Sequence, residues 1–248
     1  MLELRKIYKT FNKGTKHESE LFHDFNLKVE KNDFISVIGN NGSGKTSLIN
    51  IICGSLEIDS GQVILDNEDI TNKKDFQRYS KIGRVYQEPS VGTCTDMTVL
   101  ENMSLADNKG KSYNLTRGIR KNRIEFYKDR LRDLDLDLEN KLNVRVGELS
   151  GGQRQAMALL MATMTPIEYL ILDEHTAALD PKVADIIMKL TEKIVKEKKL
   201  TTIMVTHNIN YALEYGNRLL MMNQGEIILD EKDEKKNKIT AGEILSIY

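Results

Sequence analysis

The chain has 248 residues, of which 40% are hydrophobic and 29% are charged, so it can form one large domain or two modest ones with an ample core. Its formal net charge of −1 gives no global field that would recruit nucleic acid or an anionic membrane. No apolar stretch approaches the roughly twenty residues that cross a bilayer. Cys53 and Cys94 have neither metal-ligand spacing nor a disulfide framework. We therefore expect a cytosolic protein, which only another chain could hold at a membrane.

The first third of the chain predicts a mixed sheet around a glycine-rich loop. Alternation over residues 2–11 and 21–29 predicts two strands separated by a polar loop, and residues 61–66 predict another short strand. Between them, the apolar run 34–38 leads into the sequence Gly39-Asn-Asn-Gly-Ser-Gly-Lys-Thr-Ser47, and a second apolar run follows.

This loop matches the pattern G-x-x-x-x-G-K-T in the strand, loop and helix context that the pattern requires. Small residues let backbone N–H groups crowd around phosphates, and the helix N-terminus adds the positive end of its dipole. Lys45 would reach the β- and γ-phosphates, and the Thr46 hydroxyl would coordinate Mg²⁺. The alternative is a purely structural glycine turn. The predicted nucleotide-binding residues are Gly39, Asn40, Asn41, Gly42, Ser43, Gly44, Lys45, Thr46 and Ser47.

A short strand over residues 82–87 ends in Gln87, and the sequence then becomes helical and heavily charged as far as Gly147. We predict an inserted helical subdomain over residues 88–147. Its basic residues allow two interpretations: a docking face for an acidic or phosphate-bearing partner, or a solvated helix surface balanced by acidic residues between Asp129 and Glu139, which we favour. The basic residues are Lys109, Lys111, Arg117, Arg120, Lys121 and Arg123.

The sheet is predicted to resume at residues 169–173 and 202–206, two continuous apolar runs of the kind buried in parallel sheets. Between them, Asp180-Pro181 begins a helix with a single apolar stripe toward the sheet. A hairpin at Asn223–Gly225 and a short final helix to Tyr248 complete the chain. The predicted stripe consists of Val183, Ile186, Ile187, Leu190 and Ile194.

Two adjacent carboxylates end the strand at residues 169–173. An apolar strand that ends in Asp usually holds Mg²⁺ through its water shell beside a phosphate loop, and Asp173 fits. Glu174 is our candidate for the general base that positions the attacking water, a role worth about 10²–10⁴ in rate. The alternative is that Glu174 only caps the next segment.

A Ser-Gly-Gly turn in Leu149-Ser-Gly-Gly-Gln153 leads directly into an apolar helix and forms a second predicted anion site. One nucleotide does not need two phosphate cradles from one chain. Two copies in a head-to-tail arrangement with two-fold symmetry would place each turn against the nucleotide of the other copy. We therefore predict a homodimer that closes when ATP is present.

With these motifs in this order, essentially the whole chain resembles the nucleotide-binding subunit of an ATP-binding-cassette (ABC) transporter. The resemblance implies an α/β P-loop NTPase core, in which a parallel sheet flanked by helices joins an antiparallel β subdomain, with the inserted helical subdomain. It implies a single ABC ATPase domain over residues 1–248, with its core at 1–87 and 148–248. ATP and Mg²⁺ are the implied cofactors, and hydrolysis of ATP to ADP and phosphate is the implied reaction.

The resemblance also assigns roles to residues. Phe11 matches the aromatic that stacks on adenine, with Tyr8 as the alternative, and Gln87 matches the glutamine that contacts Mg²⁺. His207 matches the switch histidine at the γ-phosphate. The implied catalytic residues are Glu174, His207, Lys45 and Gln87, and the implied metal ligands are Thr46, Gln87 and Asp173. The signature residues are Ser150, Gly151, Gly152 and Gln153, and the D-loop is Ala178-Leu-Asp180, with Asp180 near the nucleotide.

Two residues depart from the family pattern: His175 and Ala177 stand where the family usually has Pro and Ser. The segment around them resembles a subgroup of importer ATPases, some of them linked to aromatic amino acids. The implied function is a motor subunit that drives a separate integral membrane permease, in a solute importer with a substrate-binding protein. The subunit would lie peripherally at the cytoplasmic face of the plasma membrane and grip the permease with the segment from Gln87 to about Leu105.

Two other classes stay open at this point. A non-transport ABC ATPase, for iron–sulfur assembly or cell division, would contain the same motifs. An ABC protein that acts on nucleic acid generally carries two cassettes or a long insertion, and the net charge of −1 argues against it. We therefore expect no nucleic-acid partner.

Overall fold

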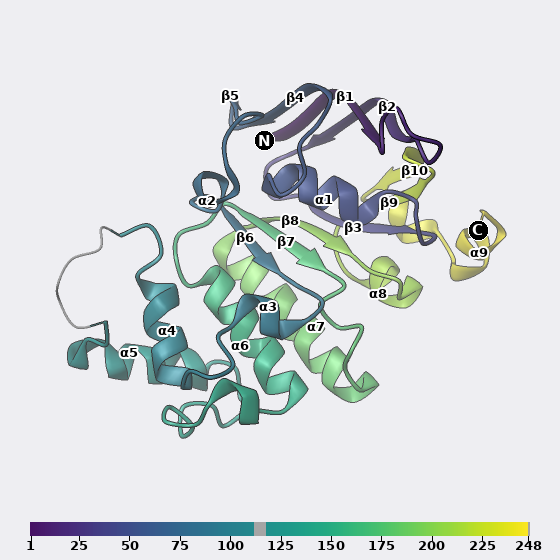
Figure 1. Cartoon of the computed structure of the whole chain (residues 1–248). Coiled ribbons are helices and arrows are strands. Elements are labelled where there is room, and N and C mark those ends of the chain that lie inside the picture. The colour runs from purple at the N-terminus through teal and green to yellow at the C-terminus, as the bar shows by residue number, and fades with distance from the viewer. Residues whose placement is uncertain (112–117, 248) are drawn as a thin grey trace. The chain divides into compact units, whose positions relative to one another are not determined.

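The computed structural model describes residues 1–111 and 118–247 (Figure 1). The chain forms two compact units: unit 1 comprises Met1–Ile82 and Lys199–Tyr248, and unit 2 comprises Gly83–Lys198. Arg117 of the basic set and Tyr248, the predicted end of the last helix, lie outside the described residues.

Unit 1 contains an antiparallel sheet with the order β2-β1-β4-β5 and a second set of neighbouring strands with the order β10-β9-β3-β8. Its strands are β1 (Leu2–Phe11), β2 (Ser19–Val29), β3 (Phe34–Gly39), β4 (Ser60–Leu65), β5 (Glu68–Asp69), β8 (Thr201–Val205), β9 (Arg218–Asn223) and β10 (Glu226–Lys232). Its helices are α1 (Lys45–Cys53), α2 (Asp75–Arg78), α8 (Ile209–Glu214), α9 (Ala241–Ile247) and the 3₁₀ turn η3 (Lys236–Lys238).

The antiparallel sheet confirms the strands predicted near the N-terminus. β1 pairs with β2 and with β4, so that Leu2 lies opposite both Val29 and Leu65. Over residues 25–29 of β2, buried apolar residues alternate with exposed polar ones, as expected when one face of a sheet is covered. The two-residue strand β5 was not predicted, because two polar residues after a turn carry no periodicity.

Strand β3 lies between β8 and β9 and pairs in parallel with both. All six residues of β3 and all five of β8 are buried, which explains their continuous apolar sequences and confirms the prediction for both runs. Helix α1 follows the glycine-rich loop directly, and both α1 and α8 contact β3. The loop at the end of β3 is therefore supported by a fully buried strand.

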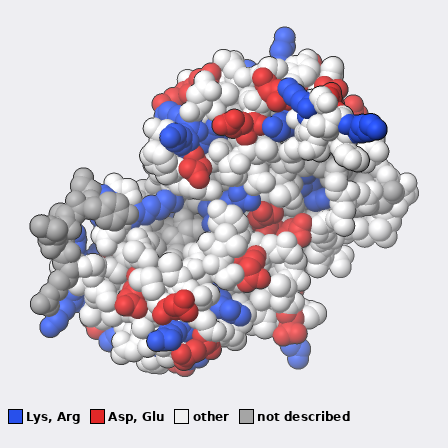
Figure 2. Space-filling model, in the orientation of Figure 1, with Lys and Arg blue, Asp and Glu red and all other residues white. Residues whose placement is uncertain are grey.

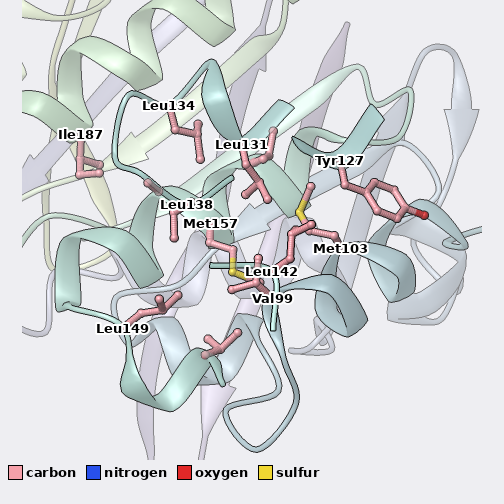
Figure 3. Close-up of a cluster of buried hydrophobic side chains, with 13 residues drawn as sticks. Val99, Met103, Tyr127, Leu131, Leu134, Leu138, Leu142, Leu149, Met157 and Ile187 are labelled. Carbon is pink, nitrogen blue, oxygen red and sulfur yellow. The ribbon is translucent and has the colours of Figure 1, made fainter. Parts of the chain in front are cut away.

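Unit 2 contains the neighbouring strands β6 and β7 and most of the long helices. Its elements are β6 (Ile82–Val85), α3 (Pro89–Gly92), α4 (Val99–Asp107), η1 (Lys121–Arg123), α5 (Ile124–Arg132), η2 (Val146–Glu148), α6 (Gly151–Thr163), β7 (Tyr169–Asp173) and α7 (Pro181–Lys198). The helices enclose a cluster of buried side chains from α4, α5, α6 and α7, among them Met103, Leu131, Met157 and Ile187 (Figure 3).

The predicted helical character of residues 88–147 ends early. Helix α5 stops at Arg132, and turns follow as far as Arg145. Asp135 and Asp137 adopt positive φ angles of 54° and 58°, which a helix cannot accommodate. Leu134 and Leu138 are still buried in the cluster of Figure 3, so their spacing reflects packing of a turn segment and not a helix face.

Helix α7 begins at Pro181, as predicted, but its buried face differs from the predicted stripe. Ile186 is 47% exposed. The prediction for Ile186 is wrong because each residue turns the helix by about 100°, which places a residue adjacent to Ile187 on its flank. The buried residues of α7 are Ala184, Ile187, Met188, Thr191, Ile194 and Val195.

Part of the basic set is neutralised by a buried carboxylate. Arg123 donates to both oxygens of Asp107, over 2.9 and 2.8 Å, and Lys111 lies 3.2 Å from the same side chain. Burial alone would raise the pKa of Asp107, but hydrogen bonds from Arg123 and Tyr127 outweigh burial and lower it. These two cations are therefore paired with Asp107, and not with the acidic run after Asp129.

Candidate functional site

The glycine-rich loop of unit 1 adopts a backbone that only glycine accepts easily. Gly39, Gly42 and Gly44 have φ angles of 147°, 79° and 104°. A Cβ at Gly39 would lie 2.1 Å from the carbonyl oxygen of Met222, inside the contact between β3 and β9. The loop is held from the other side as well, because Gly225 N–H donates to the Ser43 carbonyl over 2.9 Å. The hairpin after β9 therefore helps to shape the loop.

Lys45 is 5% exposed, and its ammonium group lies within the loop. It donates to the carbonyl oxygens of Gly39 and Asn40 over 2.7 and 2.9 Å. Gly44 caps the N-terminus of α1 and has no side chain to cover the first turn, and the N-terminus of a helix attracts anions. Thr46 is exposed in the same first turn. This arrangement suits a phosphate chain.

His207 lies at the same end of the parallel strands of unit 1 as this loop. β3 and β8 run in parallel, with Val37 opposite Val205, and Thr206 N–H donates to the Val37 carbonyl over 3.1 Å. His207 follows and is exposed. Gly39 and His207 therefore both lie at the carboxyl ends of neighbouring parallel strands. Ligands of open α/β sheets bind at this end of the strands.

Two aromatic residues on β1 remain candidates for adenine stacking. Phe11 is half-buried, and the Lys9 ammonium lies 5.3 Å from its ring centroid. Tyr8 is also half-buried, and its ring packs edge-on against His23 at 5.0 Å. Each ring thus has a neighbour, His23 for Tyr8 and Lys9 for Phe11, and the choice of Phe11 stays a prediction.

The metal-binding carboxylate predicted at the end of β7 is held by a cation that the sequence did not reveal. Arg84 Nη2 on β6 donates to Asp173 Oδ2 over 2.9 Å. The Arg84 guanidinium also stacks on the Tyr86 ring, at 4.5 Å from its centroid. The sequence did contain a signal for this pair: Arg84 is the single charged residue of an otherwise apolar strand. A buried charge of this kind is almost always paired with an opposite charge.

Glu174 begins a tight turn after β7. Its φ angle is 47°, a left-handed conformation that is uncommon for residues other than glycine. Ala177 N–H closes the turn on the Glu174 carbonyl over 2.9 Å, and Leu179 N–H donates to the Thr176 carbonyl over 3.2 Å. Asp180 is exposed, and its carbonyl accepts from Ala184 N–H in the first turn of α7.

The Ser-Gly-Gly turn forms the N-terminus of α6. Ser150 Oγ accepts from Gln153 N–H over 3.3 Å, and Gln153 Oε1 accepts from Ser150 N–H over 3.2 Å, which is a capping box. Because Oγ serves as an acceptor, the Ser150 hydroxyl hydrogen can be donated to a ligand. Gln153 Nε2 donates to the Leu136 carbonyl, so the Gln153 side chain anchors the turn. Gly151 and Gly152 follow without side chains over the helix N-terminus.

Gln87 is exposed two residues after β6, the strand that carries Arg84. The adjacent Tyr86 carbonyl accepts from Gln155 Nε2 of α6 over 3.3 Å. The sequence did not predict the contact between His175 and Thr191. His175, which differs from the usual residue of the family, is buried and contacts Thr191 of α7. Among the described residues, no group of three or more His, Cys, Asp and Glu side chains could hold a metal ion.

The family model described as "ABC transporter" matches residues 22–177 of the chain. The chain belongs to the ABC transporter family. It is 45% identical over 250 residues to a tyrosine transport ATP-binding protein of Clostridioides difficile. The match covers 100% of this chain and 98% of the relative. A probable branched-chain amino acid transport ATP-binding protein of Methanocaldococcus jannaschii is 34% identical over 231 residues, or 90% of this chain and 88% of the relative.

Solved structures confirm the fold. The ADP conformation of an ATP-binding cassette from an ABC transporter superposes with a TM-score of 0.81 at 30% identity, over 100% of this chain and 98% of that one. A dimeric cassette in a post-hydrolysis state, bound to ADP and phosphate, superposes with a TM-score of 0.79 at 30% identity, over 94% of this chain and 98% of that one. The predicted P-loop NTPase fold of the ABC type is therefore correct.

The chain is an ATP-binding subunit of an ABC transporter, an ATPase whose hydrolysis is coupled to transport. The comparisons do not favour the non-transport alternative. Within the described residues, no helix is long and apolar enough to cross a membrane. On the face drawn in Figure 2, acidic and basic side chains are interspersed, in keeping with the net charge of −1.

Proposed function

We propose that this subunit energises the uptake of an amino acid, with tyrosine as the first candidate. The observation that carries this proposal is the 45% identity, over the full length of the chain, to a protein named for tyrosine transport. The similarity to a probable branched-chain amino acid subunit supports the same solute class. The substrate would be selected by a membrane permease and a substrate-binding protein, and the subunit would lie at the cytoplasmic face of the plasma membrane.

In the proposed ATP site, Lys45 and the first N–H groups of α1 bind the β- and γ-phosphates. Phe11 stacks on adenine, and Gly39–Ser47 surround the phosphate chain. Glu174 accepts a proton from the attacking water, and His207 stabilises the phosphoryl group during transfer. Phosphoryl transfer depends mostly on positioning and on stabilisation of charge, so fixed donors around the γ-phosphate supply most of the catalysis.

The residues proposed for Mg²⁺ fit that ion. Thr46, Gln87 and Asp173 supply oxygen ligands, which a hard cation prefers, and Mg²⁺ usually binds through one or two carboxylates together with substrate phosphates. This preference agrees with the lack of a larger acidic cluster among the described residues. Asp173 Oδ2 already accepts from Arg84, which leaves Oδ1 to take part in metal binding. When bound, Mg²⁺ would neutralise charge that develops on the phosphates.

We further propose that the shared site forms in a head-to-tail homodimer. The partner subunit's Ser150, Gly151, Gly152 and Gln153 would complete the γ-phosphate shell, with Asp180 nearby. The Ser150 hydroxyl and the α6 N-terminus support this role, because both can donate to an anion. We propose one ABC ATPase domain, in which residues 88–147 form a helical subdomain inserted into a core of 1–87 and 148–248.

The segment from Gln87 to about Leu105 is our candidate for the permease contact. Its exposed apolar residues support the choice, since Val91 is 63% exposed and Leu105 is 48% exposed. Exposed apolar side chains mark a protein interface where they form a contiguous patch.

The role of Glu174 is tested by Glu174→Gln in the purified full chain. We expect the variant to bind ATP with nearly unchanged affinity, to accumulate as an ATP-bound dimer on gel filtration, and to release phosphate at about 1% of the wild-type rate or less. Ser150→Arg should likewise bind nucleotide through the intact glycine loop but fail to hydrolyse it. Wild-type phosphate release by Glu174→Gln would overturn the base assignment.

The solute class is tested by uptake. The subunit and its permease would be placed in vesicles with ATP on the side of the subunit and the substrate-binding protein on the opposite side. Entry of labelled tyrosine would then be compared with that of labelled leucine. ATP-dependent accumulation of tyrosine supports the proposal. Accumulation of leucine alone would move the substrate to the branched-chain class, and accumulation of neither would overturn amino acid import.

A further inference from the structure

His175 occupies a buried position directly beside the proposed general base. It is 2% exposed, and it follows Glu174 in a turn whose first residue has a φ angle of 47°. The His175 Nε2 atom lies 3.1 Å from Thr191 Oγ1 on helix α7. A left-handed backbone at a residue other than glycine persists when the surrounding structure holds it there. The contact with Thr191 is a side-chain link between this turn and a long helix.

The direction of this hydrogen bond follows from the single hydrogen of the threonine hydroxyl. Thr191 Oγ1 donates that hydrogen to the Ile187 carbonyl over 2.8 Å, so towards His175 the hydroxyl oxygen can only accept. The imidazole must therefore carry its hydrogen on Nε2.

Helix α7 also supports the signature turn of the same copy. A Cβ at Gly152 would lie 2.4 Å from Val183 Cγ1 on α7, so the start of α6 rests directly on this helix. The Ile187 side chain belongs to the buried cluster that α6 shares (Figure 3). Helix α7 thus contacts both the turn that begins at Glu174 and the signature turn at the start of α6. In the proposed dimer these two turns lie at different nucleotides.

We propose that the hydrogen bond from His175 to Thr191 is a positioning device, which fixes the turn that carries Glu174 to helix α7. This inference rests on the proposed role of Glu174. In this proposal His175 is a positioning residue. It holds the turn that carries Glu174 against α7, the helix on which the signature turn of α6 rests. A misplacement of about 1 Å is enough to slow an enzyme a hundredfold, so loss of one anchor is expected to lower turnover.

The test compares variants that change one atom group at a time in the full chain. Thr191→Val removes the hydroxyl and keeps the branched shape, while Thr191→Ser keeps the hydroxyl. His175→Phe keeps a planar ring and removes the donor. We expect Thr191→Val and His175→Phe each to lower kcat for ATP about tenfold, with KM and the ATP dissociation constant changed less than twofold. Thr191→Ser should retain the wild-type kcat, and the double variant should be no slower than either single one.

A purely structural role predicts a different pattern. Equal kcat losses in Thr191→Val and Thr191→Ser, or a wild-type kcat in Thr191→Val, would overturn the inference. Nitrogen-15 NMR of the histidine rings gives a measurement that does not depend on any variant folding: a His175 ring with its hydrogen on Nε2 is expected, and a neutral Nδ1–H tautomer would overturn the inference. Glu174→Gln separates the two proposals, because an inactive Glu174→Gln beside a fully active Thr191→Val refutes only the role of His175.

Discussion

Arg84 Nη2 lies 2.9 Å from Asp173 Oδ2, and the two side chains are only 7% and 14% exposed. Such a shielded pair leaves an uncompensated charge when one partner is removed, which typically costs 3–5 kcal/mol. We expect Arg84→Gln to lower the free energy of unfolding by about 3 kcal/mol in the absence of nucleotide, as measured by urea titration.

A second substitution identifies the cause. Asp173→Asn in the same chain removes the stranded charge, so Arg84→Gln with Asp173→Asn should unfold at a higher urea concentration than Arg84→Gln alone. Additive losses in the double variant would show that Arg84 acts through its stacking on Tyr86 and not through Asp173.

The glycine loop gives a matched pair of substitutions. Gly39→Ala places a Cβ 2.1 Å from the Met222 carbonyl oxygen, whereas at Gly42 no described atom lies within 4 Å of the added carbon. Both residues have positive φ angles, so both variants incur backbone strain of about 1–2 kcal/mol. Only Gly39→Ala must also separate β3 from β9, and we expect it to lose at least about 2 kcal/mol more than Gly42→Ala. Equal urea midpoints for the two variants would refute the clash.

Stability should depend on pH through His175. Burial lowers the folded-state pKa of His175 to about 4, while an unfolded histidine titrates near 6.5. Between these values the unfolded chain binds one more proton, so this contribution to stability is fully present above pH 6.5 and is lost as the pH falls toward 4, up to about 3 kcal/mol. Thermal melts of the wild type and His175→Gln from pH 4.5 to 7.5 measure the effect. The difference between the two proteins should be largest at neutral pH and shrink on acidification; a constant difference would contradict the assignment.

Gly152 and Val183 should show energetic coupling. Gly152→Ala forces a Cβ to within 2.4 Å of Val183 Cγ1, and such overpacking costs about 1–3 kcal/mol. Val183→Ala removes the clashing methyl group, so the double variant should be more stable than the sum of the single losses by about 1 kcal/mol. Gly151→Ala is the control, because its added carbon would meet Leu179 Cδ2 at an ordinary 3.4 Å.

The sequence predicted those parts of the fold that are determined by residues close together in the sequence. The buried strands β3, β7 and β8 are continuous apolar runs, and the glycine loop combines spacing with a following helix, so each was found from a local pattern. The antiparallel hairpin that turns at Asn223–Gly225 was predicted in the same way. The exposed face of α7 was misjudged at Ile186, because apolar character alone does not say which flank of a helix is covered.

The side-chain pairs that surround the site depend on distant segments and left no such pattern. Arg84 and Asp173 are 89 residues apart in the chain. His175 and Thr191 are 16 residues apart, across a turn and into a helix. In both cases the sequence shows which side chain can form a hydrogen bond or an ion pair. It does not show the partner, because packing of distant segments determines the partner and a periodic pattern carries no information about it. Gly39 ends β3, Lys45 begins α1, Asp173 ends β7 and Ser150 caps α6, while the roles of these residues in binding ATP stay predictions.

The strand that ends in the phosphate loop has a consequence for the order of events during synthesis. Strand β3 is complete at residue 39, but both of its neighbours, β8 and β9, come from the last fifth of the chain, and Gly225 N–H holds the loop at Ser43. A growing chain lacks these supports until β8, β9 and Gly225 have left the ribosome. The subunit therefore acquires its capacity to bind ATP only after this segment has been made, and a chain terminated before β9 would present the motif without a shaped loop.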